Sequence, residues 1–142
     1  MRHGKNTFKF NRESGHRRCL IANMLKALIV NGRIETTVAK AKVLKSHADQ
    51  MITLAKKNTL ATRRKAIADL MIRFNALSPK EAKALKGGDK SVLTGDRVVI
   101  GKLFDEYGKR FETREGGYTR VIRMNNRRGD GAEKCILEYL EA

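Results

Sequence analysis

The sequence predicts an α+β fold in which several helices pack on a small three-stranded mixed sheet, behind a basic extended N-terminal tail. Helical periodicity runs from about residue 14 to residue 111 and is interrupted by one short β-rich segment, and two more β-favouring segments lie near the C-terminus. The element order is therefore helix, strand, several helices, two strands. Three strands are too few to close a barrel, so helices must cover one face of the sheet. The 142 residues fit one compact domain, residues 14–142, preceded by a tail of residues 1–13.

The first half of the chain predicts a helix, a strand and a longer helix. The first helix can begin at Ser14, a candidate N-cap, and end at Asn31-Gly32, where glycine permits a left-handed cap. Its apolar residues are Leu20, Ile21, Met24, Leu25 and Leu28. Residues 34–37 are β-rich and predict one strand. Thr37 can cap the second helix, which runs to about Lys57 and has an apolar face of Ala41, Leu44, Ala48, Met51, Ile52 and Ala55.

The middle of the chain predicts further helices and one surface segment. A third helical pattern contains Ile67, Leu70, Met71 and Phe74. Ser78-Pro79-Lys80-Glu81 is a capping box with proline at the first helical position, and it predicts a short helix ending at Gly87-Gly88. Residues 75–95 have little apolar content, so we expect an insertion outside the core. Asp96 can cap the next helix, with Val99, Leu103, Phe104, Tyr107 and Phe111 on one face.

The C-terminal part predicts a β-hairpin. Residues 118–124 and 135–140 favour strands, and Cys135, Leu137 and Tyr139 alternate with their neighbours as one face of a strand would. Residues 125–131 between them are turn formers and include Arg127 and Arg128. We therefore expect a hairpin with a long basic tip.

The charge of the chain favours a polyanionic partner. Lys and Arg number 31 against 15 acidic residues, a formal net charge of +16, and residues 1–65 hold 16 of the bases with only 3 acids. Nucleic acid is the leading candidate and an anionic membrane surface the weaker one. No segment approaches the roughly 20 apolar residues that span a bilayer. The start of the chain lacks a secretory signal, so we expect a cytoplasmic, reducing environment.

The N-terminal tail combines cations with aromatic rings. Its bases and histidines extend into the first predicted helix and are Arg2, His3, Lys5, Lys9, Arg12, His16, Arg17 and Arg18. Phe8 and Phe10 are its large apolar side chains after Met1, too few to offset the entropy of ordering the segment. We expect the tail to be mobile alone and to order on RNA, whose phosphates and bases suit these side chains.

Motifs for catalysis or metal binding are missing from the sequence. It has no glycine-rich phosphate loop before a helix and no nucleophile or zinc-protease motif. His16 and Cys19 have the spacing of one helical face, but no second Cys/His pair completes a zinc site. We therefore expect no enzyme activity, no cofactor and no metal, and we expect Cys19 and Cys135 to be small core residues.

Two basic elements offer a specific way to hold folded RNA. Gly116-Gly117-Tyr118-Thr119-Arg120 would let the backbone approach a phosphate, while the tyrosine stacks and the arginine binds a phosphate bidentately. A tight turn at a strand entry explains the same glycines equally well. The hairpin tip supplies Arg127 and Arg128 at a second point. No helix-turn-helix, zinc finger or basic zipper is visible, which makes sequence-specific duplex DNA the weaker partner.

Several motifs, in order along nearly the whole chain, resemble the bacterial large-subunit ribosomal protein seventeen family. Each motif is weak alone, and their combination is specific. They are Met1-Arg2-His3, Asn11-Arg12, His16-Arg17, Ile34-Glu35-Thr36-Thr37, Ala39-Lys40-Ala41-Lys42, Ile52-Thr53-Leu54-Ala55-Lys56, Arg63-Arg64, Lys102-Leu103-Phe104-Asp105-Glu106, Arg110-Phe111, Gly116-Gly117-Tyr118-Thr119-Arg120 and Arg127-Arg128-Gly129-Asp130 with Ala132. The segment of residues 74–95 departs from the family pattern, so no role carries over to it.

The resemblance implies a structural, non-catalytic protein of the large ribosomal subunit that supports assembly and translation. It implies contact with large-subunit ribosomal RNA and with neighbouring large-subunit proteins near the polypeptide exit, and no stable homo-oligomer. The family's RNA-buried tail maps onto residues 2–18 and its strand-entry motif onto residues 116–120. Charge and resemblance together give these candidate RNA-binding residues: Arg2, His3, Lys5, Lys9, Arg12, His16, Arg17, Arg18, Lys40, Lys42, Arg63, Arg64, Gly116, Gly117, Tyr118, Arg120, Arg127 and Arg128.

One alternative stays open at this point. A free nucleoid or RNA-chaperone-like protein would bind any nucleic acid through charge alone, with no fixed stoichiometry. A ribosomal protein would instead co-sediment at one copy per large subunit and remain bound through a salt wash.

Overall fold

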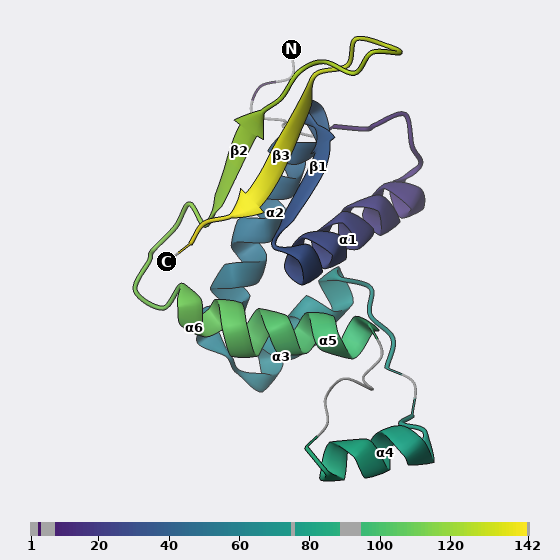
Figure 1. The fold of residues 1–142 in the computed structure, drawn as a ribbon, viewed down its shortest axis with the longest axis vertical. Coiled ribbons are helices and arrows are strands. Elements are labelled where there is room, and N and C mark those ends of the chain that lie inside the picture. The colour runs from purple at the N-terminus through teal and green to yellow at the C-terminus, as the bar shows by residue number, and fades with distance from the viewer. Residues whose placement is uncertain (1–2, 4–7, 75, 89–94, 142) are drawn as a thin grey trace.

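A three-stranded sheet and the long helix behind it form the frame of the molecule (Figure 1). The computed structural model describes residues 3, 8–74, 76–88 and 95–141. Strands β1 (Arg33–Thr37), β2 (Thr119–Arg123) and β3 (Lys134–Tyr139) lie in the order β1-β3-β2. Helix α2 (Val38–Lys57) covers one face, and in Figure 1 no helix covers the face toward the viewer. The predicted α+β class and order of elements are confirmed.

The predicted mixed pairing is wrong, because both strand pairs are antiparallel. β3 returns from the hairpin between the other two strands and runs opposite to each of them. The register places Leu137 between Ile34 and Val121 on the face toward α2, and Ile136 between Glu35 and Ile122 on the other face. Cys135, Leu137 and Tyr139 are buried, as their alternation predicts.

The C-terminal end of α1 (Ser14–Asn31) is tied to the rest of the body by its carbonyl groups. Gly32 is the C-cap with φ of 75°, and its N–H donates to the Leu28 carbonyl. Two side chains distant in sequence bind the last turn: Lys102 Nζ donates to the Val30 carbonyl at 2.8 Å, and the Tyr107 hydroxyl donates to the Ile29 carbonyl at 3.2 Å. A cation at this end also complements the helix dipole. At the other end the N-cap is Glu13, one residue before the predicted Ser14.

Helix α2 is the most extensively buried helix of the described structure. Thr37 is its N-cap, as predicted, although the threonine side chain makes no capping hydrogen bond. The predicted apolar face is buried, and Val38 joins it: the buried residues are Val38, Ala41, Leu44, Ala48, Met51, Ile52 and Ala55. The Thr119 hydroxyl donates to Asp49 Oδ1 at 3.1 Å, which fixes β2 to this helix.

Helix α3 (Leu60–Asp69) ends earlier than the sequence pattern indicates. Thr59 and Thr62 form a capping box at its start. Met71 adopts a positive φ of 51°, so the helix cannot continue to Phe74. Leu70 is buried as predicted, whereas Met71 and Phe74 are 44% and 42% exposed.

The last helical segment is continuous and contains one π-helical turn. It comprises α5 (Gly95–Gly101), the π turn η1 (Lys102–Tyr107) and α6 (Gly108–Arg110), which together cross below the sheet in Figure 1. Its predicted apolar face is buried: Val99, Leu103, Phe104, Tyr107 and Phe111. Asp96 lies inside the first turn and pairs with Lys26 at 3.0 Å, so it is not the N-cap that the sequence indicates.

Helix α4 (Pro79–Lys86) stands apart from the other helices in Figure 1. The predicted capping box is confirmed: the Ser78 N–H donates to Glu81 Oε2 at 2.8 Å, and the Glu81 N–H donates to Ser78 Oγ at 3.3 Å. These hydrogen bonds to Ser78 hold the pKa of Glu81 below its ordinary value. No residue of α4 is buried.

Replacing residues 78–94 with a short Gly-Ser linker is expected to change the free energy of unfolding by about 1 kcal/mol or less. Removing helix α4 takes no buried side chain out of the core, because none of its residues is buried. Changing the length of a surface loop costs only ~0.6 kcal/mol per doubling of its length. Urea unfolding of the full chain and the shortened chain measures the difference. A large drop in the midpoint would mean that the replaced segment, which includes Leu85, docks on the body.

Substituting Gly108 is expected to destabilise the fold. A Cβ at Gly108→Ala would lie 3.0 Å from the Ala55 carbonyl oxygen, a backbone atom that cannot move without shifting α2. Overpacking of this kind costs about 1–3 kcal/mol, more than the helix propensity of alanine returns. Gly15→Ala is the matched control, because a Cβ there meets nothing within 4 Å. Equal urea midpoints for the two variants would contradict the close packing of α6 on α2.

Candidate nucleic-acid interface

The described part of the tail directly precedes α1 in the sequence and folds into a turn. Phe10 and Asn11 have positive φ values of 55° and 50°, and the Arg12 N–H donates to the Lys9 carbonyl at 3.1 Å. Arg12 also contacts the His16 ring, and Arg17 Nη1 donates to the Arg12 carbonyl at 3.4 Å. His3 and Lys9 are exposed. The predicted sites Arg2 and Lys5 lie outside the described residues.

Cations from three segments meet where the hairpin loop passes the start of α2. Lys40 of α2, Arg127 of the loop and Lys134 of β3 line a hollow of 400 Å³ with the threonines at positions 36 and 37. Beside it, Phe8 of the tail lies with Lys42, Ala132 and Glu133 around a second hollow of 330 Å³. We call Phe8, Lys40, Lys42, Arg127 and Lys134 the hairpin-end patch. The sequence singled out Lys40, Lys42 and Arg127, and the structure brings them together.

Lys134 is the member of this patch that the sequence analysis missed. It forms an ion pair with Glu35 on the neighbouring strand. Strand periodicity could have found it, because Lys134 occupies the outward-facing register that also contains Ile136 and Glu138.

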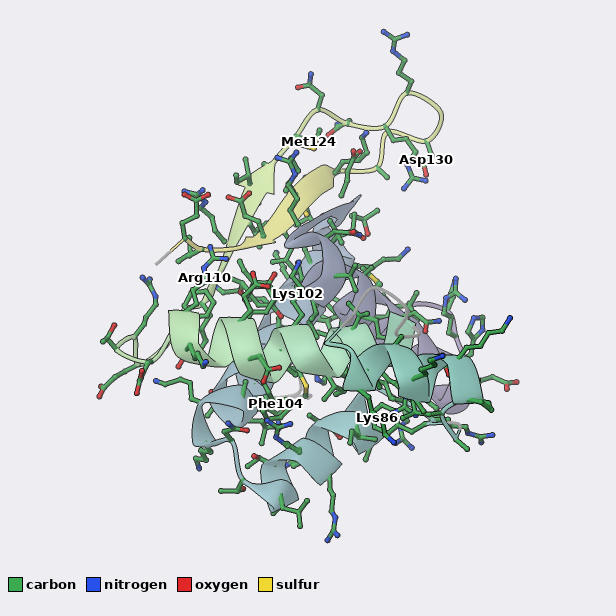
Figure 2. The ribbon with its side chains drawn as sticks, turned by 60° about the horizontal axis from the view of Figure 1, so that its bottom comes forward. Lys86, Lys102, Phe104, Arg110, Met124 and Asp130 are labelled. Atoms are coloured by element: carbon green, nitrogen blue, oxygen red, sulfur yellow. The ribbon has the colours of Figure 1, made fainter. Side chains whose placement is uncertain are left out.

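The hairpin loop projects beyond the strands, with Met124 and Asp130 on its two sides (Figure 2). Its tip is closed by backbone hydrogen bonds of 2.9 Å between Arg127 and Ala132 and between Gly131 and Arg127. Arg127 also pairs with Asp130 at 3.3 Å. Arg128 is exposed and has no hydrogen-bond or ion-pair partner in the described structure, so its guanidinium is available to a phosphate.

The strand-entry motif does not supply the stacking tyrosine that the sequence predicts. The Tyr118 ring is 3% exposed and packs edge-on against Phe111, at 5.3 Å between ring centroids, with Lys56 over its face. A ring enclosed in this way cannot stack on a base, and we correct that assignment. Gly116 and Gly117 are exposed, and Gly117 has a φ of 61°, so the backbone there remains open to a phosphate.

The remaining predicted arginines differ in how free they are. Arg120 Nε donates to Glu138 Oε1 at 2.9 Å across the outer face of the sheet. Arg63 donates to Asn58 Oδ1 and lies over the Phe104 ring, at 4.8 Å from the centroid. Arg18 and Arg64 are exposed and make no hydrogen bond or ion pair within the described residues.

The two cysteines differ in burial. Cys135 is buried in β3, as expected, but Cys19 is exposed on α1, so the expectation that both are core residues is wrong for Cys19. The buried residues of α1 are Ala22, Leu25, Leu28 and Ile29, and position 19 falls outside the face that they form.

Among the described residues, no three His, Cys, Asp or Glu side chains gather as a metal site would require. Likewise, no helix in the described part of the chain is long and apolar enough to cross a membrane.

These features define a small basic α+β protein whose exposed cations lie at separate points of its surface: the turn before α1, the hairpin-end patch, the hairpin tip and α3. Such an arrangement suits a polyanion that is held at several points.

Comparison with known proteins places the chain in one family. A family model described as "Ribosomal protein L17" matches residues 20–140. A protein of Protochlamydia amoebophila named "Large ribosomal subunit protein bL17" is 62% identical over 140 residues, which cover 99% of each chain. Proteins of the same name from Chlamydia abortus and Chlamydia trachomatis are 61% and 58% identical over the same lengths. The chain belongs to the ribosomal protein L17 family.

Arg128→Ala is expected to weaken RNA binding more than Arg120→Ala. Arg128 is free to contact a phosphate, whereas Arg120 is held by Glu138. Only Arg128→Ala should therefore reduce the number of counterions that are released when the protein binds RNA. Each lost phosphate contact lowers the slope of log affinity against log salt by roughly 0.7–0.9. Filter binding of each variant to large-subunit RNA across a salt series measures the slope. If Arg120→Ala changed it as much as Arg128→Ala, the pairing with Glu138 would not decide which arginine binds.

Proposed function

We propose that this chain is a structural component of the large ribosomal subunit that binds large-subunit ribosomal RNA and supports subunit assembly and translation. Membership of the ribosomal protein L17 family carries this proposal. The free cations of the surface supply the physical means, because lysine and arginine release counterions when they contact phosphates. The protein does no catalysis, and it works in the cytoplasm as part of the subunit.

The RNA contacts are made by the tail with the start of α1, the hairpin-end patch, the hairpin tip, α3 and the strand entry before β2. The residues that carry them are His3, Lys9, Arg12, His16, Arg17, Arg18, Lys40, Lys42, Arg63, Arg64, Gly116, Gly117, Arg127 and Arg128, and in the tail also Arg2 and Lys5. Exposure supports most of these assignments, and Arg64 and Arg128 have no competing partner in the described structure. Arg120 contributes less, because Glu138 already binds it.

The partners of the chain in the subunit include neighbouring ribosomal proteins near the polypeptide exit, and the chain forms no stable homo-oligomer. The family resemblance supports this placement. The outer face of the sheet suits a protein neighbour better than RNA, because its arginine Arg120 is already paired with Glu138. Ile122 and Met124 nearby are 40% and 38% exposed.

Sedimentation of a cell lysate tests the proposed function. We expect the chain in the large-subunit fraction at one copy per subunit, and we expect it to stay there through a wash at raised salt. A free nucleic-acid-binding protein would instead spread over several fractions and wash off, because its contacts depend on charge alone. Quantitative mass spectrometry against other large-subunit proteins gives the stoichiometry, and a variable ratio well below one would contradict the proposal.

A further inference from the structure

A hollow of 340 Å³ lies where α1, α2 and α3 meet, away from the hairpin-end patch. Its floor is apolar: Leu25 and Met51 are 2% and 1% exposed, and Ile21 beside them is half-buried. Its rim is polar and combines side chains from all three helices: Arg18, His47, Gln50, Lys65 and Asp69. This volume is at the small end of the ~300–1,000 Å³ range of ligand pockets.

The polar side chains of the rim form no interactions that stabilise the fold among the described residues. Within the described structure, none of the five makes a hydrogen bond or ion pair to another residue. A larger hollow of 750 Å³ between α1 and α5 differs in this respect, because Lys26 and Asp96 on its wall pair with each other at 3.0 Å. Convergent polar groups without internal partners, set around an apolar floor, are the ordinary features of a ligand site.

The chemistry of the hollow matches one nucleotide. Base faces are apolar and pack on aliphatic or imidazole side chains, while base edges need hydrogen-bond partners in the plane of the ring. Here the floor and His47 can contact the faces, Gln50 offers both a donor and an acceptor, and Asp69 can accept from a ring or exocyclic N–H. Arg18 and Lys65 on the same rim can bind the flanking phosphates.

We propose that this hollow, the α1–α2–α3 pocket, holds a single unstacked nucleotide of ribosomal RNA. The inference rests on the proposed function for the presence of RNA and adds a base-specific contact to it. The cations of the rim, Arg18 and Lys65, outnumber its one carboxylate, which favours an anionic partner such as RNA over a basic or apolar protein side chain. Specific recognition of RNA commonly uses bases that are turned out of a helix, so a pocket for one base fits a protein that binds folded RNA.

The test uses large subunits from cells in which a variant is the only copy of this protein. Gln50→Ala with Asp69→Ala removes the edge contacts, and both side chains are exposed, so the fold should tolerate the change. Dimethyl sulfate and a carbodiimide then report the Watson–Crick edges of the ribosomal RNA. We expect one unpaired nucleotide, protected in normal subunits, to become roughly tenfold more reactive in the variant. Asn23→Ala with Glu112→Ala, two exposed and unpartnered side chains elsewhere, is the matched control and should leave that nucleotide protected.

A photoreactive residue provides a second, independent measurement. Benzoylphenylalanine in place of Gln50 should crosslink, in ultraviolet light, to the same nucleotide that the chemical probes identify. A crosslink to another protein, or unchanged reactivity in the double variant while the protein remains at one copy per subunit, would overturn the pocket but leave the proposed function intact. Absence of the unaltered chain from large subunits would overturn the proposed function itself.

Discussion

The rest of the structure depends on the close packing around α2. Its buried face carries alanine at positions 41, 48 and 55, one every two turns, and each is at most 1% exposed. Small side chains at this spacing let neighbouring elements approach the helix backbone, and a Cβ at Gly108 of α6 would lie only 3.0 Å from the Ala55 carbonyl oxygen. Leu44, Met51 and Ile52 fill the space between these points. One helix therefore contacts the sheet on one side and the remaining helices on the other. A single central helix suits a chain of this length, because a small domain can bury only a limited core.

Much of this arrangement could be predicted from the sequence, because it follows from local patterns. The apolar face of α2, the cap at Gly32, the capping box of α4 and the alternation in β3 are each set by residues close together in the chain. Features that depend on distant partners were missed. The antiparallel placement of β1 depends on β3, about 100 residues later. The end of α3 was missed for a local reason, because the left-handed backbone of Met71 is not indicated by its side chain.

The candidate interface shows the same limit. A basic residue is recognisable in a sequence, but its availability is not, because a partner from another element can occupy it. Arg120 and Arg128 look alike in the chain, yet one is bound by Glu138 and the other is free. Tyr118 lies in a motif suited to RNA and is nevertheless enclosed by Phe111 and Lys56. The α1–α2–α3 pocket is the converse case, a candidate site that no sequence motif indicates. The residues of its rim come from three helices that only the fold brings together.

The distribution of paired and free cations links the fold to its partner. On the outer face of the sheet, Glu35 and Glu138 neutralise neighbouring bases, and the apolar side chain of Ile122 is 40% exposed. At the turn before α1, at the hairpin tip and along α3 the bases outnumber the acids, so the free chain carries unbalanced positive charge there. Phosphates balance that charge, and a partner that binds only the folded chain also stabilises it. The segments that present these cations are connected to α2 or to elements that pack against it. RNA bound at several of these points therefore links from outside the same elements that the packing around α2 links from inside.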